Sequence, residues 1–253
     1  MKERDSREIG GAWRQAQQHG TAEPGPALAP FVASIWWARW SYAEPYAQVV
    51  MPFPSVHLTV RPGCAPEVHG VATSRGIRVL EGEGRVTGVE FRPGGFRPFL
   101  RSRVAALTDR VVSVADVPGL RGTPAEPGGP DELRAWLEPF APPPDPGVAW
   151  AAETVALVAA DPTVMRVDQL AQLCGTSVRG RQRRFAEYVG VGPKWVIRRY
   201  RLREVTERMA QQHAEPVRWA ELAAELGFAD QAHMARDFAA VFGEPLTRYA
   251  ARY

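Results

Sequence analysis

The residues with the clearest capacity for chemistry are three polar side chains at helical spacing within the segment from Val167 to Phe185. Arg179, Gln182 and Arg183 stand at i, i+3 and i+4 and therefore share one face of a helix. An Arg side chain can donate two hydrogen bonds to guanine O6 and N7, and a Gln side chain can pair with adenine N6 and N7. This pattern indicates recognition of base edges rather than catalysis.

Two short helices must position these side chains. Asp168 is placed to cap the first helix, and Gly175 is placed to end it. A second helix is expected to begin at Ser177, with its apolar residues on the face opposite the polar ones. Two short helices joined by a turn that contains Gly predict a helix-turn-helix, whose second helix enters the major groove.

The charge of the surrounding segment agrees with this prediction. Nine basic residues and the single acidic Glu187 lie between Ser177 and Arg203, whereas the whole chain carries a formal net charge of only +3. Concentrated positive charge is typical of contacts with phosphates. The alternative for this segment alone is a solvated, charged face of an ordinary helical domain.

The same unit occurs a second time beyond Pro216, after a long helix that is expected to begin at Gly192-Pro193. Gly227 repeats the role of Gly175, and Phe238 repeats the role of Phe185. The face of the second reading helix that does not pack presents small and polar side chains: Gln231, Ala232, Ala235 and Arg236. Small residues allow close approach to DNA and can contact thymine methyl groups. The repeat is stronger evidence than either copy.

The N-terminal half has a different pattern. Short apolar and aromatic runs are separated by Gly and Pro turn signals at strand-length spacing, which predicts a mostly β barrel or sandwich. The fold class is therefore α+β with two domains. We expect a tail at 1–25, a sensor domain at 26–140, a Pro-rich linker at 141–149 and an all-α DNA-binding domain at 150–253.

With both copies in place, residues 150–253 resemble the DNA-binding domain of AraC/XylS-type transcription regulators. The motifs are L-A-x-L-x-G-x-S with Q-R-R-F, then R-x-x-R-L, then L-A-x-E-L-G-F-x-D-Q-A-H-M-x-R-D-F. The resemblance implies that the two reading helices enter successive major-groove segments about 34 Å apart. It implies base contacts from these residues: Arg179, Gln182, Arg183, Gln231, Ala232, Ala235 and Arg236.

One position departs from that family. Arg181 stands where an apolar residue is usual, on the packing face of the helix, and Gly180 precedes it. A buried, unpaired Arg is unfavourable, so Arg181 is expected to snorkel or to pair. Gly180 weakens the helix by about 1 kcal/mol relative to Ala.

The N-terminal half resembles a cupin-like sensor domain found ahead of such DNA-binding domains in bacterial regulators. Aromatic side chains could line an apolar effector pocket there, with Arg92 as an anion anchor. The alternative is that these aromatics are simply core. The candidate ligand-binding residues are Trp36, Trp37, Trp40, Phe53, Phe91, Arg92 and Phe96.

No catalytic or metal-binding arrangement is expected. His57, His69 and Glu90 could ligate a metal, but their spacing differs from the clustered ligands of metal-binding cupins. Signatures of hydrolases, nucleotide-binding loops and zinc proteases are missing. We expect neither a metal nor a cofactor, and we expect that the protein is not an enzyme.

These observations predict a DNA-binding transcription regulator that responds to a small-molecule effector. Its partners would be double-stranded DNA, an effector and RNA polymerase, without a membrane, and both a monomer and a homodimer fit. We expect a bacterial cytoplasmic location, at the nucleoid when the protein is bound to DNA. The alternatives are a metal-dependent cupin-like enzyme fused to a DNA-binding domain, and a DNA binder that needs no effector.

Overall fold

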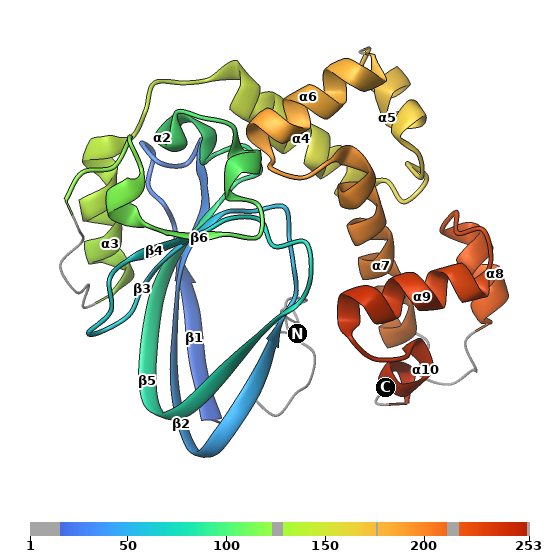
Figure 1. Cartoon of the computed structure of the whole chain (residues 1–253), viewed down its shortest axis with the longest axis horizontal. Coiled ribbons are helices and arrows are strands. Elements are labelled where there is room, and N and C mark those ends of the chain that lie inside the picture. Colours follow the sequence, from blue (N-terminus) through green and yellow to red (C-terminus); the bar gives the residue numbers. More distant parts are fainter. Residues whose placement is uncertain (1–15, 123–128, 176, 212–217, 252–253) are drawn as a thin grey trace.

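The N-terminal half forms one antiparallel sheet and the C-terminal half is helical, as the sequence predicts (Figure 1). This computed structural model describes residues 16–122, 129–175, 177–211 and 218–251. The sheet has the strand order β1-β2-β5-β3-β4-β6. Its strands are β1 (Gln17–Ala22), β2 (Val32–Val50), β3 (His57–Val60), β4 (Glu67–His69), β5 (Gly76–Phe91) and β6 (Val111–Ser113).

The long strands β2 and β5 dominate the sheet. They pair from Val32↔Phe91 to Val50↔Gly76, and the register shifts between Tyr42 and Tyr46. Such an irregularity bends a strand. Figure 1 shows this bend: the ribbon formed by β2 and β5 descends, turns and rises again toward the helical half. Strand β3 covers β5 only from His57 to Val60, so it flanks one part of this ribbon.

Alternation along the strands creates the core of the N-terminal half. Ile35, Val89 and Leu58 are neighbours in register on β2, β5 and β3, and all three are fully buried. The short helices that follow β5 complete this core: α2 (Arg97–Leu100), the 3-10 helices η1 (Val104–Leu107) and η2 (Val114–Asp116), and α3 (Pro130–Leu137) with η3 (Glu138–Phe140). The narrower prediction of a cupin-like barrel stays a prediction.

Two predicted boundaries differ from the structure. Residues 17–22 of the expected tail form β1, which pairs with β2 from Gln17↔Trp40 to Ala22↔Ile35. Residues 1–15 lie outside the described part. The expected linker at 141–149 ends early, because α4 begins at Pro146, and the Asp145 side chain caps it by accepting a hydrogen bond from Gly147 N at 2.7 Å.

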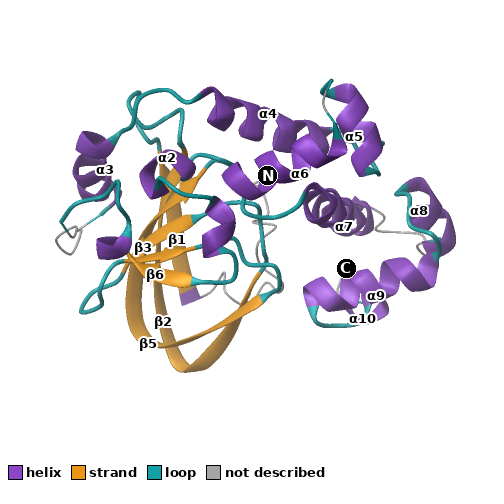
Figure 2. Ribbon diagram, turned by 45° about the horizontal axis from the view of Figure 1, so that its top comes forward, coloured by secondary structure: helices purple, strands orange, loops and turns teal. Residues whose placement is uncertain are grey.

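The C-terminal half consists of seven described helices (Figure 2). They are α4 (Pro146–Ala160), α5 (Val167–Leu173), α6 (Val178–Tyr188), α7 (Pro193–Gln211), α8 (Trp219–Glu225), α9 (Gln231–Phe242) and α10 (Leu246–Ala250). The long helix α7 connects the pair α5–α6 to the pair α8–α9. None of the described helices has both the length and the apolar character needed to cross a bilayer.

The hydrophobic packing does not follow the boundary between sheet and helices. One continuous core contains the sheet residues, the buried faces of α4 to α6, and Val196 and Ile197 at the start of α7. A second core contains Leu202 and Val205 further along α7 together with α8, α9 and α10, and it includes Met51 from the segment after β2. The first helical pair is therefore packed as part of the sheet region.

Candidate nucleic-acid interface

The first helix-turn-helix unit consists of α5 and α6. Helix α5 begins two residues earlier than a cap at Asp168 would give, so Asp168 lies in its first turn and is not the cap. The Gln169 carboxamide oxygen instead accepts hydrogen bonds from the backbone N–H groups of Met165 and Arg166, both at 2.9 Å. Helix α6 begins as predicted, because the Ser177 hydroxyl accepts from Gly180 N at 3.2 Å.

Helix α6 has one buried and one exposed face, as predicted, although Val178, which was expected on the packing face, is exposed. Phe185 is fully buried and meets the Trp150 ring of α4 edge to face, with ring centroids 5.7 Å apart. The side chains of Arg179, Gln182 and Arg183 are exposed. Helix α6 thus presents three side chains that can donate hydrogen bonds to an external partner.

Arg181 lies on the packing face, as predicted, and of the two expected outcomes, snorkelling and pairing, it does not snorkel. Its exposed fraction is 0 %, and its guanidinium carbon lies 5.9 Å from the centre of the Trp150 ring. Arg184 approaches the same ring more closely, at 4.0 Å, and is half-buried. The α4 helix covers this face of α6, so the Arg181 side chain cannot reach solvent.

We expect Arg181→Leu to raise the melting temperature by several degrees. A buried guanidinium carries a desolvation penalty of several kcal/mol, and an apolar side chain of similar volume removes that penalty. Calorimetry of the full chain measures the effect. Arg184→Leu is the matched control, since it removes a half-buried charge from the same ring and should change the melting temperature little. A lower melting temperature for Arg181→Leu would contradict the prediction.

The second unit, α8 and α9, is built in the same way. Gly227 has a φ of 67° in the turn, and the Asp230 carboxylate caps α9 by accepting from His233 N at 2.6 Å. Met234 and Phe238 are fully buried. On the opposite face, Gln231, Ala232 and Arg236 are exposed and Ala235 is half-buried.

The connecting helix α7 is less basic at its surface than its sequence suggests. Arg198 pairs with Asp237 of α9 at 2.6 Å, and Arg201 donates to backbone carbonyls of both helix-turn-helix units. Arg199 is 2 % exposed and donates from Nε to the Pro52 carbonyl at 2.6 Å. Burial lowers the pKa of Arg199 to about 10, so it stays protonated at neutral pH. These side chains hold the protein together, and Lys194 remains as an exposed cation at the start of α7.

The N-terminal half contacts the first unit and the connecting helix α7. Arg97 of α2 forms an ion pair with Glu187 of α6 at 2.6 Å, and Thr108 donates to the Gly190 carbonyl at 2.7 Å. Farther along the chain, the Trp195 indole N–H donates to the Thr73 carbonyl at 3.3 Å. A structural change in the sheet region therefore has direct routes to α6, which carries candidate base contacts, and to α7, which connects the two units.

The candidate effector residues do not line one pocket. Phe91 and Phe96 are buried and pack with Phe99 in an aromatic cluster, with ring centroids 4.8 to 6.1 Å apart, so they belong to the core. Arg92 is exposed and donates to the Ala29 carbonyl at 2.8 Å. Phe53 lies under the Arg199 guanidinium, whose carbon is 4.4 Å from its ring centre.

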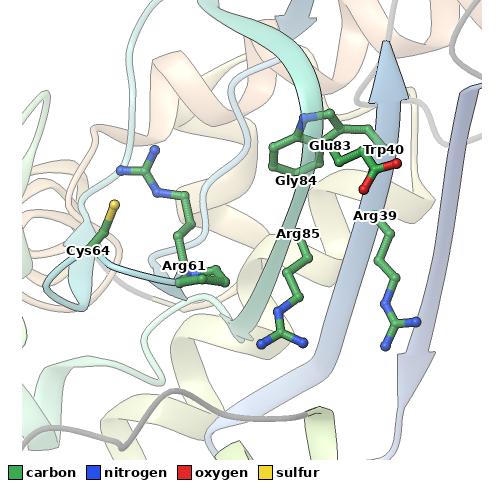
Figure 3. A pocket seen from close by; sticks show the side chains of 8 residues that line it. Arg39, Trp40, Arg61, Cys64, Glu83, Gly84 and Arg85 are labelled. Atoms are coloured by element: carbon green, nitrogen blue, oxygen red, sulfur yellow. The ribbon is translucent and has the colours of Figure 1, made fainter.

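Of the three tryptophans of β2, Trp40 borders a hollow. Trp37 lies against Gly20 of β1, and Trp36 lies across Gly88 of β5. The hollow has a volume of about 660 Å³ and lies where β3 no longer covers β5 (Figure 3). Its lining residues are Arg39, Trp40, Arg61, Pro62, Cys64, Glu83, Gly84 and Arg85.

Two arginines of this hollow are strand neighbours. Arg39 and Arg85 are direct partners in the β2–β5 register, and Figure 3 shows their side chains extending side by side. Neither forms an ion pair with a carboxylate in the described part of the chain. Their proximity depends on the register of the two strands, which the sequence pattern does not reveal.

The residues considered for metal binding form a row across three strands. His57 is paired with His69 on one side and with Glu90 on the other. Burial and the positive charge of Arg78 lower the pKa of His69 to about 4, so this imidazole is neutral at neutral pH. Within the described ranges, no three His, Cys, Asp or Glu side chains gather as a metal site would require.

Two family profiles match parts of the chain. Residues 21–113 match a domain of unknown function (DUF6597), and residues 170–252 match a helix-turn-helix domain. The second match covers most of α5 and all of α6 to α10. It confirms the expected AraC-type helix-turn-helix domain in the C-terminal half.

A search of curated proteins gave no match. Among solved structures, the chain is similar to ToxT from Vibrio cholerae O395, with 11% identity, a TM-score of 0.38, and coverage of 94% of this chain and 98% of that chain. Wild-type ToxT of strain SCE256 with a bound unsaturated fatty acid gives 11% identity, a TM-score of 0.36, and coverage of 93% and 95%. A likeness of this extent supports no inference about function.

Proposed function

We propose that this protein is a sequence-specific DNA-binding transcription regulator that reads DNA with α6 and α9. The observation that carries the proposal is the repeated unit, since each copy has a capped reading helix with one buried face and one free polar or small face. Arg179, Gln182 and Arg183 would contact bases from α6. The α9 contacts would come from Gln231, Ala232, Ala235 and Arg236.

Phosphate contacts would supply most of the affinity, and base contacts would supply the sequence preference. Because Arg181, Arg198, Arg199 and Arg201 are engaged within the protein, fewer cations are available to phosphates than the sequence suggests. The binding constant for DNA should therefore fall less steeply with salt concentration than it would if all nine basic residues contacted phosphates. Such a regulator works in the cytoplasm, at the nucleoid when bound, with RNA polymerase as a partner and as a monomer or a homodimer.

DNA selection with the purified full chain tests this function. Genomic fragments are enriched at two salt concentrations and sequenced. A regulator that reads with two helices should enrich a bipartite motif whose halves are separated by about one helical turn. Salt-sensitive binding without any motif would instead indicate a binder driven only by charge, and it would overturn the proposal.

A small-molecule effector bound by the N-terminal half would control DNA binding by favouring one arrangement of the contacts to α6 and α7. The hollow beside Trp40 supports this part of the proposal. Like charges that are direct partners across two strands repel each other, and an anion between Arg39 and Arg85 would relieve that repulsion. The expected effector is therefore a small molecule that carries a carboxylate or phosphate group.

We expect anionic probes to stabilise the protein through these arginines. At a concentration 100 times its Kd, a ligand raises the free energy of unfolding by about 2.7 kcal/mol. Thermal shifts with phenylacetate, phenyl phosphate and uncharged 2-phenylethanol measure this effect. The double variant Arg39→Gln, Arg85→Gln should lose the response to the anions, and Arg121→Gln, an exposed charge elsewhere, should keep it. Equal shifts in all three proteins would exclude this site, and a bound anion that leaves DNA affinity unchanged would exclude effector control through it.

A further inference from the structure

We propose that Arg201 is a positioning residue that fixes the two helix-turn-helix units relative to each other, and thereby sets the half-site spacing that the protein accepts. This inference rests on the proposed function of α6 and α9. It concerns a residue that lies on neither reading helix and belongs to neither set of candidate base contacts.

Arg201 bonds to both units at once. From α7, its Nη1 donates to the carbonyls of Leu226 and Gly227 at 3.0 and 2.8 Å, where α8 ends and the turn of the second unit begins. Its Nη2 donates to the Met165 carbonyl at 3.3 Å, in the loop that leads into α5. One rigid guanidinium therefore joins the turn of the second unit to the entry of the first.

The surroundings favour this arrangement. The carbonyls at the end of a helix carry partial negative charge, so a cation at the end of α8 is favourable. The guanidinium carbon also lies 4.9 Å from the centre of the Phe228 ring. Burial lowers the pKa of Arg201, yet Arg remains protonated at neutral pH, so the bridge does not switch on and off in that range.

The two loops that Arg201 joins also touch directly. Gly227 has no side chain, and a Cβ at this position would lie 2.1 Å from the Met165 sulfur, so the Met165 side chain occupies that space. The Met165 backbone is tied in turn to the first turn of α5 through the Gln169 side chain. A displacement of the second unit is therefore transmitted to the start of the first.

This contact matters because the units do not share a hydrophobic core. The first unit packs with the sheet region, and the second packs around the later part of α7. Apolar packing therefore sets each unit on its own part of α7. The rotation of one unit about α7 relative to the other therefore depends on the few contacts that cross between them, the Arg201 bridge and the Met165–Gly227 contact, and on the packing of Met51 in the second core.

Operator spacing is the property that this geometry controls. One added or removed base pair moves a half-site by about 3.4 Å and rotates it by roughly 35° about the duplex axis. A rigidly held pair of reading helices should reject such a change, whereas a loosely held pair should tolerate it. Sequence preference within each half-site should not depend on Arg201.

Two measurements test the inference with the full chain. The first measures affinity for the selected operator and for versions with one base pair inserted or deleted between the half-sites. Wild type should lose roughly 5-fold or more in affinity, the effect of about one lost base contact. Arg201→Gln should reduce this discrimination by at least about 3-fold and keep the same bases preferred in each half-site.

The second measurement does not require DNA. Spin labels on unnatural amino acids at the exposed positions Gln172 of α5 and Ala240 of α9 report the distribution of distances between the units. We expect Arg201→Gln to broaden this distribution. If no sequence-specific DNA binding is found, the proposed function fails, and the distance distribution still decides whether Arg201 holds the units.

Arg203→Gln is the matched control, because Arg203 lies on the same helix and pairs within it, with Glu207 at 2.6 Å. Both measurements should be unchanged in this variant. If Arg201→Gln does not fold, Arg201→Lys takes its place, since a single ammonium group cannot reach both loops and should also broaden the distribution. Equal distance distributions and equal spacing preference in the Arg201 variant and the control would overturn the proposal.

Discussion

Arg183→Ala and Arg236→Ala are each expected to weaken binding to the selected operator by roughly 5- to 150-fold, equivalent to about 1–3 kcal/mol. Arg183 is exposed on α6 and Arg236 is exposed on α9, and each can form two hydrogen bonds with one guanine. Truncation to Ala removes these hydrogen bonds without disturbing the buried face of either helix.

The pattern of the loss matters more than its size. Arg183→Ala should relax base preference in one half-site only, and Arg236→Ala in the other half-site only. Repeating the DNA selection with each variant measures this. Arg248→Ala is a suitable control, because Arg248 is exposed on α10, away from both reading helices. A uniform loss of affinity with an unchanged motif would mean that these arginines contact phosphates instead of bases.

A large loss of stability is expected when Phe238, in the second of the two cores, is truncated. Phe238 is fully buried, stacks on Phe242 with ring centroids 4.0 Å apart, and meets Tyr249 edge to face at 5.2 Å. Phe238→Ala should cost about 3–5 kcal/mol, a large part of the total stability of an ordinary domain. Hydrogen exchange should show lost protection in α8 to α10, while the sheet and α4 to α6 keep theirs.

Phe185→Ala is the informative comparison. Phe185 occupies the corresponding place in the first unit, but it lies in the core shared with the sheet. Its truncation should therefore reduce protection in the sheet region as well as in α4 and α6. Val178→Ala, at an exposed position of α6, should change stability by less than about 0.5 kcal/mol. If Phe238→Ala removed protection throughout the chain, the two cores would not be independent.

The sequence was sufficient to predict the helices and their faces because these depend on local periodicity. Phe185, Met234 and Phe238 are buried as the 100° spacing predicts, and Arg179, Gln182 and Arg183 are exposed. The helix cap at Ser177 and the turn at Gly227 follow from local backbone preferences. Asp168 failed as a cap because the helix begins at Val167, which places Asp168 in the first turn, where its carboxylate accepts from Arg166 Nε at 3.1 Å.

Interactions between distant segments could not be predicted in this way. The pairing of Arg39 with Arg85 depends on the register of two long strands, and composition gives no indication of that register. The burial of Phe91 and Phe96 depends on how α2 packs against the sheet. The positive charge of α7 was overestimated because a helical projection does not show which arginines bond to carbonyls of other segments.

The division of the apolar packing also determines which parts of this chain could be exchanged between related proteins. Along α7 the first core ends at Ile197 and the second begins at Leu202, so the boundary between the two cores lies inside this helix. A chimera joined at the Pro-rich segment before α4 would separate residues that are packed together. A chimera joined between Ile197 and Leu202 would preserve the first core, and it would separate only the segment around Met51 from the second core, so a transplanted sensor should carry its own first reading helix with it.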